Sequence, residues 1–163
     1  MIDSVLIPEI RVKVLKDKKT KNELESALNV KINFSGNDVE IDGEGLELFT
    51  AKNIVKAIGR GFSPHNSMRL LDEEQQLEII ELNNYNEKAL KRIKSRVIGS
   101  NGKTRKQIEL HSGAVVSVFG KTISIIGTYK QLNIARDAVL MIVRGSKHSA
   151  VYSFLHRKSV KTI

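Results

Sequence analysis

Two glycines three positions apart open a basic run, an arrangement that lets a phosphate chain approach the protein backbone. The segment contains, in order, Ile98, Gly99, Ser100, Asn101, Gly102, Lys103, Thr104, Arg105 and Lys106. Glycine has no Cβ atom and readily adopts positive φ, so a polyanion can reach the backbone amides that begin a following helix. The alternative is a turn between two helices that needs glycine for its own geometry. The adjacent cations favour contact with a nucleic-acid backbone.

Each residue around these glycines has an expected role in contact with RNA. Ser100 and Asn101 are expected at the exposed tip, and the cations are expected to contact phosphates, which position RNA without specifying its sequence. The expected contact residues are Arg92, Arg96, Ile98, Gly99, Ser100, Asn101, Gly102, Lys103, Arg105, Lys106 and Ile108. Sequence preference is expected from an apolar groove formed by Ile98, Ile108 and one face of residues 115–118. Core packing is the alternative for Ile108, because an apolar helix stripe must face a sheet.

The charge of the chain favours a polyanionic partner and is concentrated beside the two glycines. The 163 residues carry a formal net charge of +9. Residues 91–106 contain seven Lys or Arg residues and no Asp or Glu. Clustered cations attract phosphates and release their counterions on binding. A basic surface that only promotes solubility is the alternative, but the local clustering indicates a binding surface.

Other classes of function have little support in the sequence. The four histidines are widely separated, and no cysteine or paired carboxylate accompanies them at the spacing of metal ligands. The phosphate-binding pattern Gly-x-x-x-x-Gly-Lys-Ser/Thr is absent. We therefore expect no catalytic residue, metal, cofactor or small-molecule substrate. No apolar run approaches the roughly 20 residues that cross a bilayer, so we expect a soluble, cytoplasmic protein without a membrane partner.

One structural unit occurs twice in the chain, in a register of 84 residues. Thr20 aligns with Thr104, and residues 48–61 align with residues 132–145 without a gap. In this register Leu15 and Lys18 replace the two glycines. The first copy is therefore expected to keep the scaffold and to lack the glycine loop.

The repeat and the composition together predict four parts of the chain. We expect a degenerate first domain at residues 1–61, a linker at 62–74, a second domain at 75–145 and a basic C-terminal tail at 146–163. The tail has the spacing of a short amphipathic helix, and docking on a neighbouring unit, contact with RNA and a loose end remain alternatives. The lysines near residue 18 either bind phosphates non-specifically or form a solvated turn.

Apolar periodicity predicts the order β-α-α-β-β-α in both units, an α+β fold. The predicted strands cover residues 4–7, 31–35, 38–42, 77–82, 114–119 and 122–126. The predicted helices cover residues 8–15, a segment that Thr20 caps, and residues 46–58, 87–97, 104–111 and 129–143.

A glycine loop between two helices, followed by a strand hairpin and a closing helix, resembles the type I KH domain, which binds about four nucleotides of single-stranded nucleic acid. The segments LKRIKSRVIGSNGKTRKQIE, GKTISIIG, ARDAVLMIVRGSKHSAVYSFL and KNIVKAIGRGFSP extend this match over nearly the whole chain. Together they resemble the tandem-KH small-subunit ribosome-assembly factors of archaea and eukaryotes, the partner-of-Nob-one or dimethylase-partner family.

This resemblance implies two tandem type I KH domains, each with a three-stranded sheet and three helices, of which the first is degenerate. It also implies a protein without catalysis of its own that binds single-stranded rRNA near the 3′ end of 16S rRNA during ribosome biogenesis. The expected protein partners are the nuclease that trims this end, the dimethyltransferase that modifies it, or a translation initiation factor. A general KH-type regulator of mRNA or translation, and an adaptor whose basic surface binds acidic proteins, are the alternatives.

Overall fold

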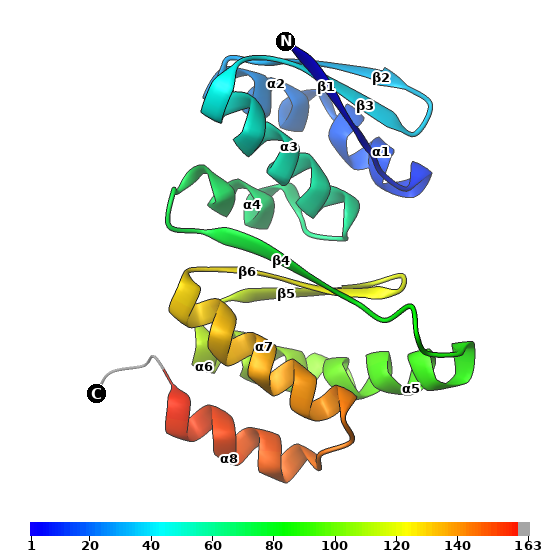
Figure 1. Cartoon of the computed structure of the whole chain (residues 1–163), viewed down its shortest axis with the longest axis vertical. Helices are drawn as coiled ribbons and strands as arrows, with labels where there is room; N and C mark the ends of the chain where they lie inside the picture. The colour runs from blue at the N-terminus through cyan, green and yellow to red at the C-terminus, as the bar shows by residue number, and fades with distance from the viewer. Residues whose placement is uncertain (160–163) are drawn as a thin grey trace. The chain divides into compact units, whose positions relative to one another are not determined.

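The computed structural model describes residues 1–159 and divides the chain into two compact units, Met1–Asp72 and Glu73–Ile163. Each unit contains one three-stranded antiparallel sheet with helices packed on it (Figure 1). The order of elements is β-α-α-β-β-α in both units, as the repeat predicted.

The first unit contains β1 (Ile2–Leu6), α1 (Glu9–Lys16), α2 (Lys18–Leu28), β2 (Lys31–Ser35), β3 (Asp38–Asp42) and α3 (Gly45–Gly59). Its strands lie in the order β1-β3-β2. On the central strand, the alternation of side chains buries Val39 and Ile41 completely, and α3 packs on this sheet. The hairpin turns at Gly36, which has a φ of 62°. The strands β2 and β3 have the predicted bounds, whereas β1 begins at Ile2, earlier than predicted.

Residues 62–74, which we expected to form a linker, are partly helical. They contain α4 (Pro64–Ser67) and η1 (Met68–Leu71), and both contact α3. Pro64 stands at the first helical position after Ser63, whose hydroxyl caps the helix. Most of this segment therefore belongs to the first unit, and the boundary between the units falls after Asp72.

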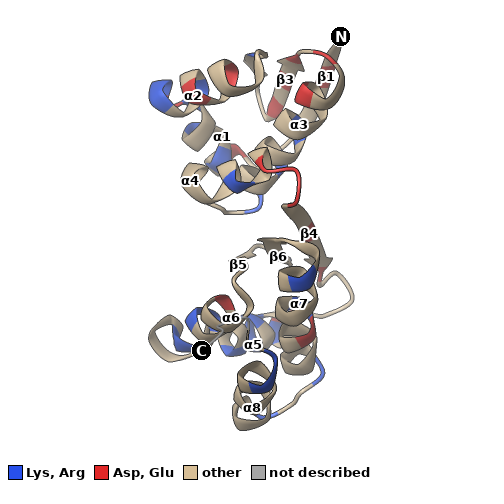
Figure 2. Ribbon diagram, turned by 90° about the vertical axis from the view of Figure 1, so that its left-hand side faces the viewer, with Lys and Arg blue, Asp and Glu red and all other residues tan. Residues whose placement is uncertain are grey.

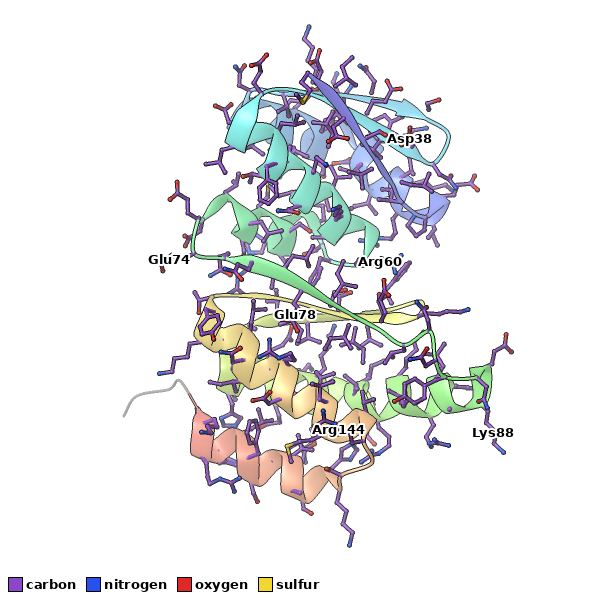
Figure 3. All side chains as sticks on the ribbon, viewed as in Figure 1. Asp38, Arg60, Glu74, Glu78, Lys88 and Arg144 are labelled. Atoms are coloured by element: carbon purple, nitrogen blue, oxygen red, sulfur yellow. The ribbon has the colours of Figure 1, made fainter. Side chains whose placement is uncertain are left out.

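The second unit contains β4 (Gln76–Glu81), α5 (Glu87–Ile98), η2 (Ser100–Gly102), α6 (Lys103–Ser112), β5 (Val115–Phe119), β6 (Thr122–Gly127) and α7 (Tyr129–Val143). Its strands lie in the order β4-β6-β5. A capping box of Thr128 and Gln131 begins α7. On the same helix Arg136 pairs with Glu78 of β4 across 2.8 Å, and Figure 3 labels Glu78 on its strand.

A further helix, α8 (His148–Lys158), forms most of the C-terminal tail. It packs against α6 and α7, and its apolar residues Val151 and Leu155 are fully buried in the core of the second unit. The tail is thus an ordered part of this unit up to Ser159, and residues 160–163 lie outside the described residues.

Equivalent glutamates make the same hydrogen bond within each of the two units. In the first unit, Oε2 of Glu25 accepts a hydrogen bond of 2.8 Å from the backbone nitrogen of Ile32. In the second, Oε2 of Glu109 accepts one of 2.8 Å from the nitrogen of Val116. Each residue stands 84 positions from its counterpart, so the repeat extends to single hydrogen bonds.

An arginine performs a second equivalent role in each unit. Arg11 of α1 donates to the carbonyl oxygens of Ile58 and Phe62, both at 2.7 Å, near the end of α3. Arg96 of α5 donates to the equivalent carbonyl oxygens near the end of α7, at Ile142, 3.0 Å away, and Ser146. Another pair of equivalent arginines ends the closing helix of each unit: Arg60 follows α3, and Arg144 follows α7 (Figure 3).

Candidate nucleic-acid interface

The glycine loop, Gly99–Gly102, requires positive φ at three of its four positions. Gly99 ends α5 with φ 75° and ψ 173°, Asn101 has φ 55°, and Gly102 precedes α6 with φ 75° and ψ 14°. The nitrogen of Gly102 donates to the oxygen of Gly99 across 3.2 Å, which makes the loop a tight turn. Glycine is the residue that adopts these conformations without steric cost, so the turn geometry accounts for part of the motif.

The two glycines differ in what surrounds them. A Cβ atom on Gly99 would lie 2.8 Å from both the Cβ and the backbone nitrogen of Thr104, closer than such atoms approach. A Cβ atom on Gly102 would meet nothing within 4 Å. The absence of a side chain at Gly99 therefore lets the loop pack against Thr104 of α6, whereas the space beside Gly102 is open.

Among the described residues, no side chain caps the start of α6, and its first turn contains no acid. In the first unit the start of α2 is capped by Asp17, whose carboxylate accepts from the backbone nitrogen and the hydroxyl of Thr20, both at 3.2 Å. The prediction that Thr20 caps this helix was therefore wrong, because Asp17 performs that role. An uncapped helix start carries free amide donors and partial positive charge. In the first unit the carboxylate of Asp17 occupies the position in front of the helix start. In the second unit the equivalent position is open to an anion.

Cations surround this helix start, as Figure 2 shows in blue on α5 and α6. Lys103 and Lys106 are exposed, and Arg105 is half-buried. The Nε of Arg105 is buried and has no hydrogen-bond partner among residues 1–159. Three cations stand within the first four residues of α6, beside its uncapped start.

A hollow of about 280 Å³ follows one face of α5. It is lined by Glu87, Leu90, Lys91, Lys94, Ser95 and Ile98. Ile98, which precedes the glycine loop, is 37% exposed, and Leu90 packs partly against the core. The lining combines the apolar side chains of Leu90 and Ile98, which suit the faces of bases, with two lysines, which suit phosphates, and one acid, Glu87. Of these residues, only Ile98 was among the expected contacts. The spacing of Leu90, Lys91, Lys94 and Ile98 on one helical face was the signal that identifies the others.

Two expected contacts differ from what the structure shows. Ile108 is fully buried in the core, so its side chain offers no surface to a base and core packing, the alternative, holds. The guanidinium of Arg96 faces two backbone carbonyls instead of solvent, so Arg96 joins α5 to the end of α7. Arg92 is exposed, but it lies one turn before Arg96 on the same face of α5 and outside the hollow.

The edge strand β5 forms part of the same region because α5 and α6 both contact it. Val115 and Val118 are half-buried, and Val116 is buried. Since Glu109 accepts from the nitrogen of Val116, that backbone group points away from β6. Backbone groups two residues apart on a strand point to the same side, so those of Val118 also face this edge.

Two other kinds of site receive no support. No group of three or more His, Cys, Asp or Glu residues that could hold a metal ion occurs within residues 1–159. None of the helices in that range is long and apolar enough to cross a membrane.

Comparison with known proteins identifies relatives over the whole chain. A family model for the second KH domain of PNO1 proteins, described as a eukaryotic type KH-domain (KH-domain type I), matches residues 76–160. A KH domain-containing protein of Methanocaldococcus jannaschii is 39% identical, and the match covers 98% of this chain and 75% of that protein. The pre-rRNA-processing protein PNO1 of Coccidioides immitis is 29% identical, with 72% of this chain and 52% of that protein covered.

A solved structure also matches both units. It is the complex of a/eIF2alpha, aDim2p and rRNA from Pyrococcus horikoshii, with a TM-score of 0.90 and 43% sequence identity. The match covers 97% of this chain and 93% of that chain.

Proposed function

The chain belongs to the partner-of-Nob-one (PNO1) family of KH-domain proteins, and from that premise we propose that it binds single-stranded rRNA in maturation of the small ribosomal subunit. The expected fold, two tandem type I KH units, is confirmed by the family match and the structural similarity. The relatives include a pre-rRNA-processing protein and a protein solved together with rRNA, which supports this function.

The observation that carries the proposal is the open start of α6 beneath the glycine loop. Its amides have no side-chain cap among the described residues, and Lys103, Arg105 and Lys106 add positive charge at the same place. In this arrangement a phosphate of the RNA occupies the helix start, and Gly102 lets the sugar-phosphate chain pass without a side chain in the way.

The remaining contacts follow from the geometry around this phosphate. Ser100 and Asn101 lie at the tip of the loop, where they can bond to sugar or phosphate oxygens. The following bases rest on Ile98 and Leu90, and the backbone of Val118 offers hydrogen bonds to their edges. Lys91 and Lys94 contact phosphates at the rim of the hollow, in the role that Arg96 was expected to share.

We further propose that the bound RNA is the 3′ end of 16S rRNA and that the protein acts in the cytoplasm without catalysis. Initiation factor 2, through its alpha subunit, is the first protein partner to test, because the similar structure contains a/eIF2alpha beside aDim2p and rRNA. The nuclease and the dimethyltransferase that act on the same RNA end are further candidates.

Binding to oligonucleotides that tile the 3′ end of the rRNA tests the proposal. Lys103→Ala/Lys106→Ala and Lys18→Ala/Lys19→Ala form a matched pair, since each removes two exposed positive charges. Loss of two phosphate contacts reduces the slope of log affinity against log salt by about 1.4 for single strands. We expect this loss, and weaker binding of the preferred tile, only from the first variant.

Two results would overturn the proposal. If no tile is preferred, selective rRNA binding fails, and an adaptor role of the basic surface becomes the better explanation. If both variants weaken binding equally, affinity depends on net charge, and the second unit has no dedicated site.

A further inference from the structure

We propose that Tyr152 of α8 is a positioning residue that holds the glycine loop and Lys103 ready for RNA. This inference rests on the proposed function of the second unit and adds a device from outside the KH core of β-α-α-β-β-α. Two contacts carry it. The hydroxyl of Tyr152 lies 3.0 Å from Oγ1 of Thr104, and the ammonium of Lys103 lies 5.9 Å from the centre of the Tyr152 ring.

The hydroxyl contact reaches the loop through Thr104. This residue is 1% exposed and lies directly behind Gly99, whose missing Cβ would approach it within 2.8 Å. The hydroxyl oxygen of Thr104 is the atom nearest to the place where a Cβ on Gly99 would stand, and the same oxygen contacts the hydroxyl of Tyr152. A shift of Tyr152 therefore moves the side chain of Thr104, against which Gly99 of the loop packs.

The repeat shows that this hydroxyl contact is particular to the second unit. Thr20, the counterpart of Thr104, bonds through its Oγ1 to the carboxylate of Asp17. In the second unit Tyr152 contacts the equivalent oxygen, and no acid stands in the first turn of α6. The threonine is thus fixed by a neutral group, and the helix start stays open to an anion.

The ring contact follows the same logic for Lys103. An aromatic face attracts an ammonium group by about 0.5–1 kcal/mol at an exposed site without neutralising its charge. Residues 146–159 contain no Asp or Glu, so α8 offers Lys103 a ring where a carboxylate would compete with phosphate. The side chain is oriented beside the loop while its positive charge stays available.

The helix that carries Tyr152 is itself firmly placed. Val151 and Leu155 are fully buried, and Nε2 of His148 lies 2.9 Å from the carbonyl oxygen of Arg96, close to the end of α5. At the other end of α8, the hydroxyl of Ser159 lies 3.1 Å from Nδ1 of His111 on α6. A helix fixed to both α5 and α6 is a rigid support for the loop between them.

Three variants separate positioning of the loop from general support of the fold. Tyr152→Phe removes the hydroxyl contact and keeps the ring, and Tyr152→Leu removes both. Phe154→Leu is the matched control, because Phe154 is a half-buried aromatic residue of the same helix that packs on the same core. Each variant is measured for urea unfolding, for affinity and salt dependence with the preferred rRNA oligonucleotide, and for amide hydrogen exchange without RNA.

We expect Tyr152→Leu to weaken RNA binding about fivefold to tenfold and to lower the salt slope by about 0.7, the share of one phosphate contact. Tyr152→Phe keeps the ring, so it should have the salt slope of the wild-type protein, but it lacks the hydroxyl contact and should bind RNA more weakly than wild type. Combined with Lys103→Ala, Tyr152→Leu should leave the slope where Lys103→Ala alone puts it. Amides of residues 99–104 should exchange faster in Tyr152→Leu and as in wild type in Phe154→Leu.

The inference is overturned if Tyr152→Leu binds RNA as wild type does with an unchanged salt slope. It is also overturned if Phe154→Leu matches Tyr152→Leu in affinity, slope and exchange, since both would then act through the stability of α8. Failure of the proposed function gives a different result, in which the wild-type protein prefers no rRNA oligonucleotide, and the positioning role then fails with it.

Discussion

Replacement of Gly102 by aspartate or asparagine tests the open helix start with two side chains of nearly equal size. A Cβ atom at this position meets nothing within 4 Å, so neither substitution clashes with the protein. The left-handed conformation costs a non-glycine residue about 1–2 kcal/mol, and less for Asn and Asp, whose short polar side chains tolerate it. The two variants should therefore lose similar, small amounts of stability and differ in RNA binding through one negative charge.

The size of that difference follows from Coulomb's law. A carboxylate about 5 Å from an RNA phosphate is repelled by roughly 1 kcal/mol in bulk water and by roughly 3 kcal/mol at an effective dielectric constant of about 20. Since about 1.4 kcal/mol corresponds to a tenfold change in affinity, Gly102→Asp should bind RNA roughly 5- to 150-fold more weakly than Gly102→Asn.

Fluorescence anisotropy with the preferred oligonucleotide measures this ratio, and urea unfolding of both proteins provides the stability control. The ratio should shrink as salt is raised, because screening weakens the repulsion. Equal affinities of the Asp and Asn variants at low salt would refute the reasoning, since no phosphate would then lie beside Gly102.

Four further substitutions, of which Arg92→Ala is a control, test the residues that support the site and one ion pair on the surface of the first unit. Gly99→Ala should destabilise the protein by roughly 2–3 kcal/mol in urea unfolding, because its methyl group overlaps the first turn of α6, and an unchanged midpoint would contradict this packing. Arg96→Ala should cost about 2–3 kcal/mol through two lost charged hydrogen bonds, whereas the exposed Arg92→Ala should change stability by less than about 0.5 kcal/mol. The pKa of Asp3 is lowered, first by its hydrogen bond from Lys52, so its contribution to stability is present above the ordinary pKa of 3.8 and is lost as pH falls through the lowered value. Thermal unfolding of Asp3→Asn between about pH 2 and pH 6 should show a shallower acid dependence than wild type, and identical curves would exclude this pair as a contributor.

The elements with strong periodicity were predictable from the sequence. Alternating side chains around Gly36-Asn37 gave the bounds of β2 and β3, and the helical spacing after Thr128 gave those of α7. The start of α2 was predicted wrongly, at Thr20 instead of Asp17, because both are good capping residues and only the fold decides between them.

The site was predictable in its loop and less so in its surroundings. Gly99, Gly102 and the cations after them are marked by residue type and local spacing. The role of Arg96 is not marked in this way, because its partners are backbone carbonyls 46 and 50 residues away. Every residue has a backbone carbonyl, so residue types do not identify the partner. The burial of Ile108 was equally hidden, since an apolar residue on a helix fits a core or a groove until its neighbours are known.

The equivalent arginines define a cassette that can be exchanged between the two units. Arg11 and Thr20 enclose the eight residues 12–19, whereas Arg96 and Thr104 enclose the seven residues 97–103. The arginine end of each cassette is anchored on the carbonyls near the end of the closing helix, whereas at the other end Thr20 bonds to Asp17 inside its cassette and Thr104 contacts Tyr152 of α8. Transplanting residues 97–103 in place of 12–19 would remove Asp17 and install a glycine loop on the first scaffold, where Met68 stands at the position equivalent to Tyr152, so a tyrosine at position 68 would be needed as well to support that loop.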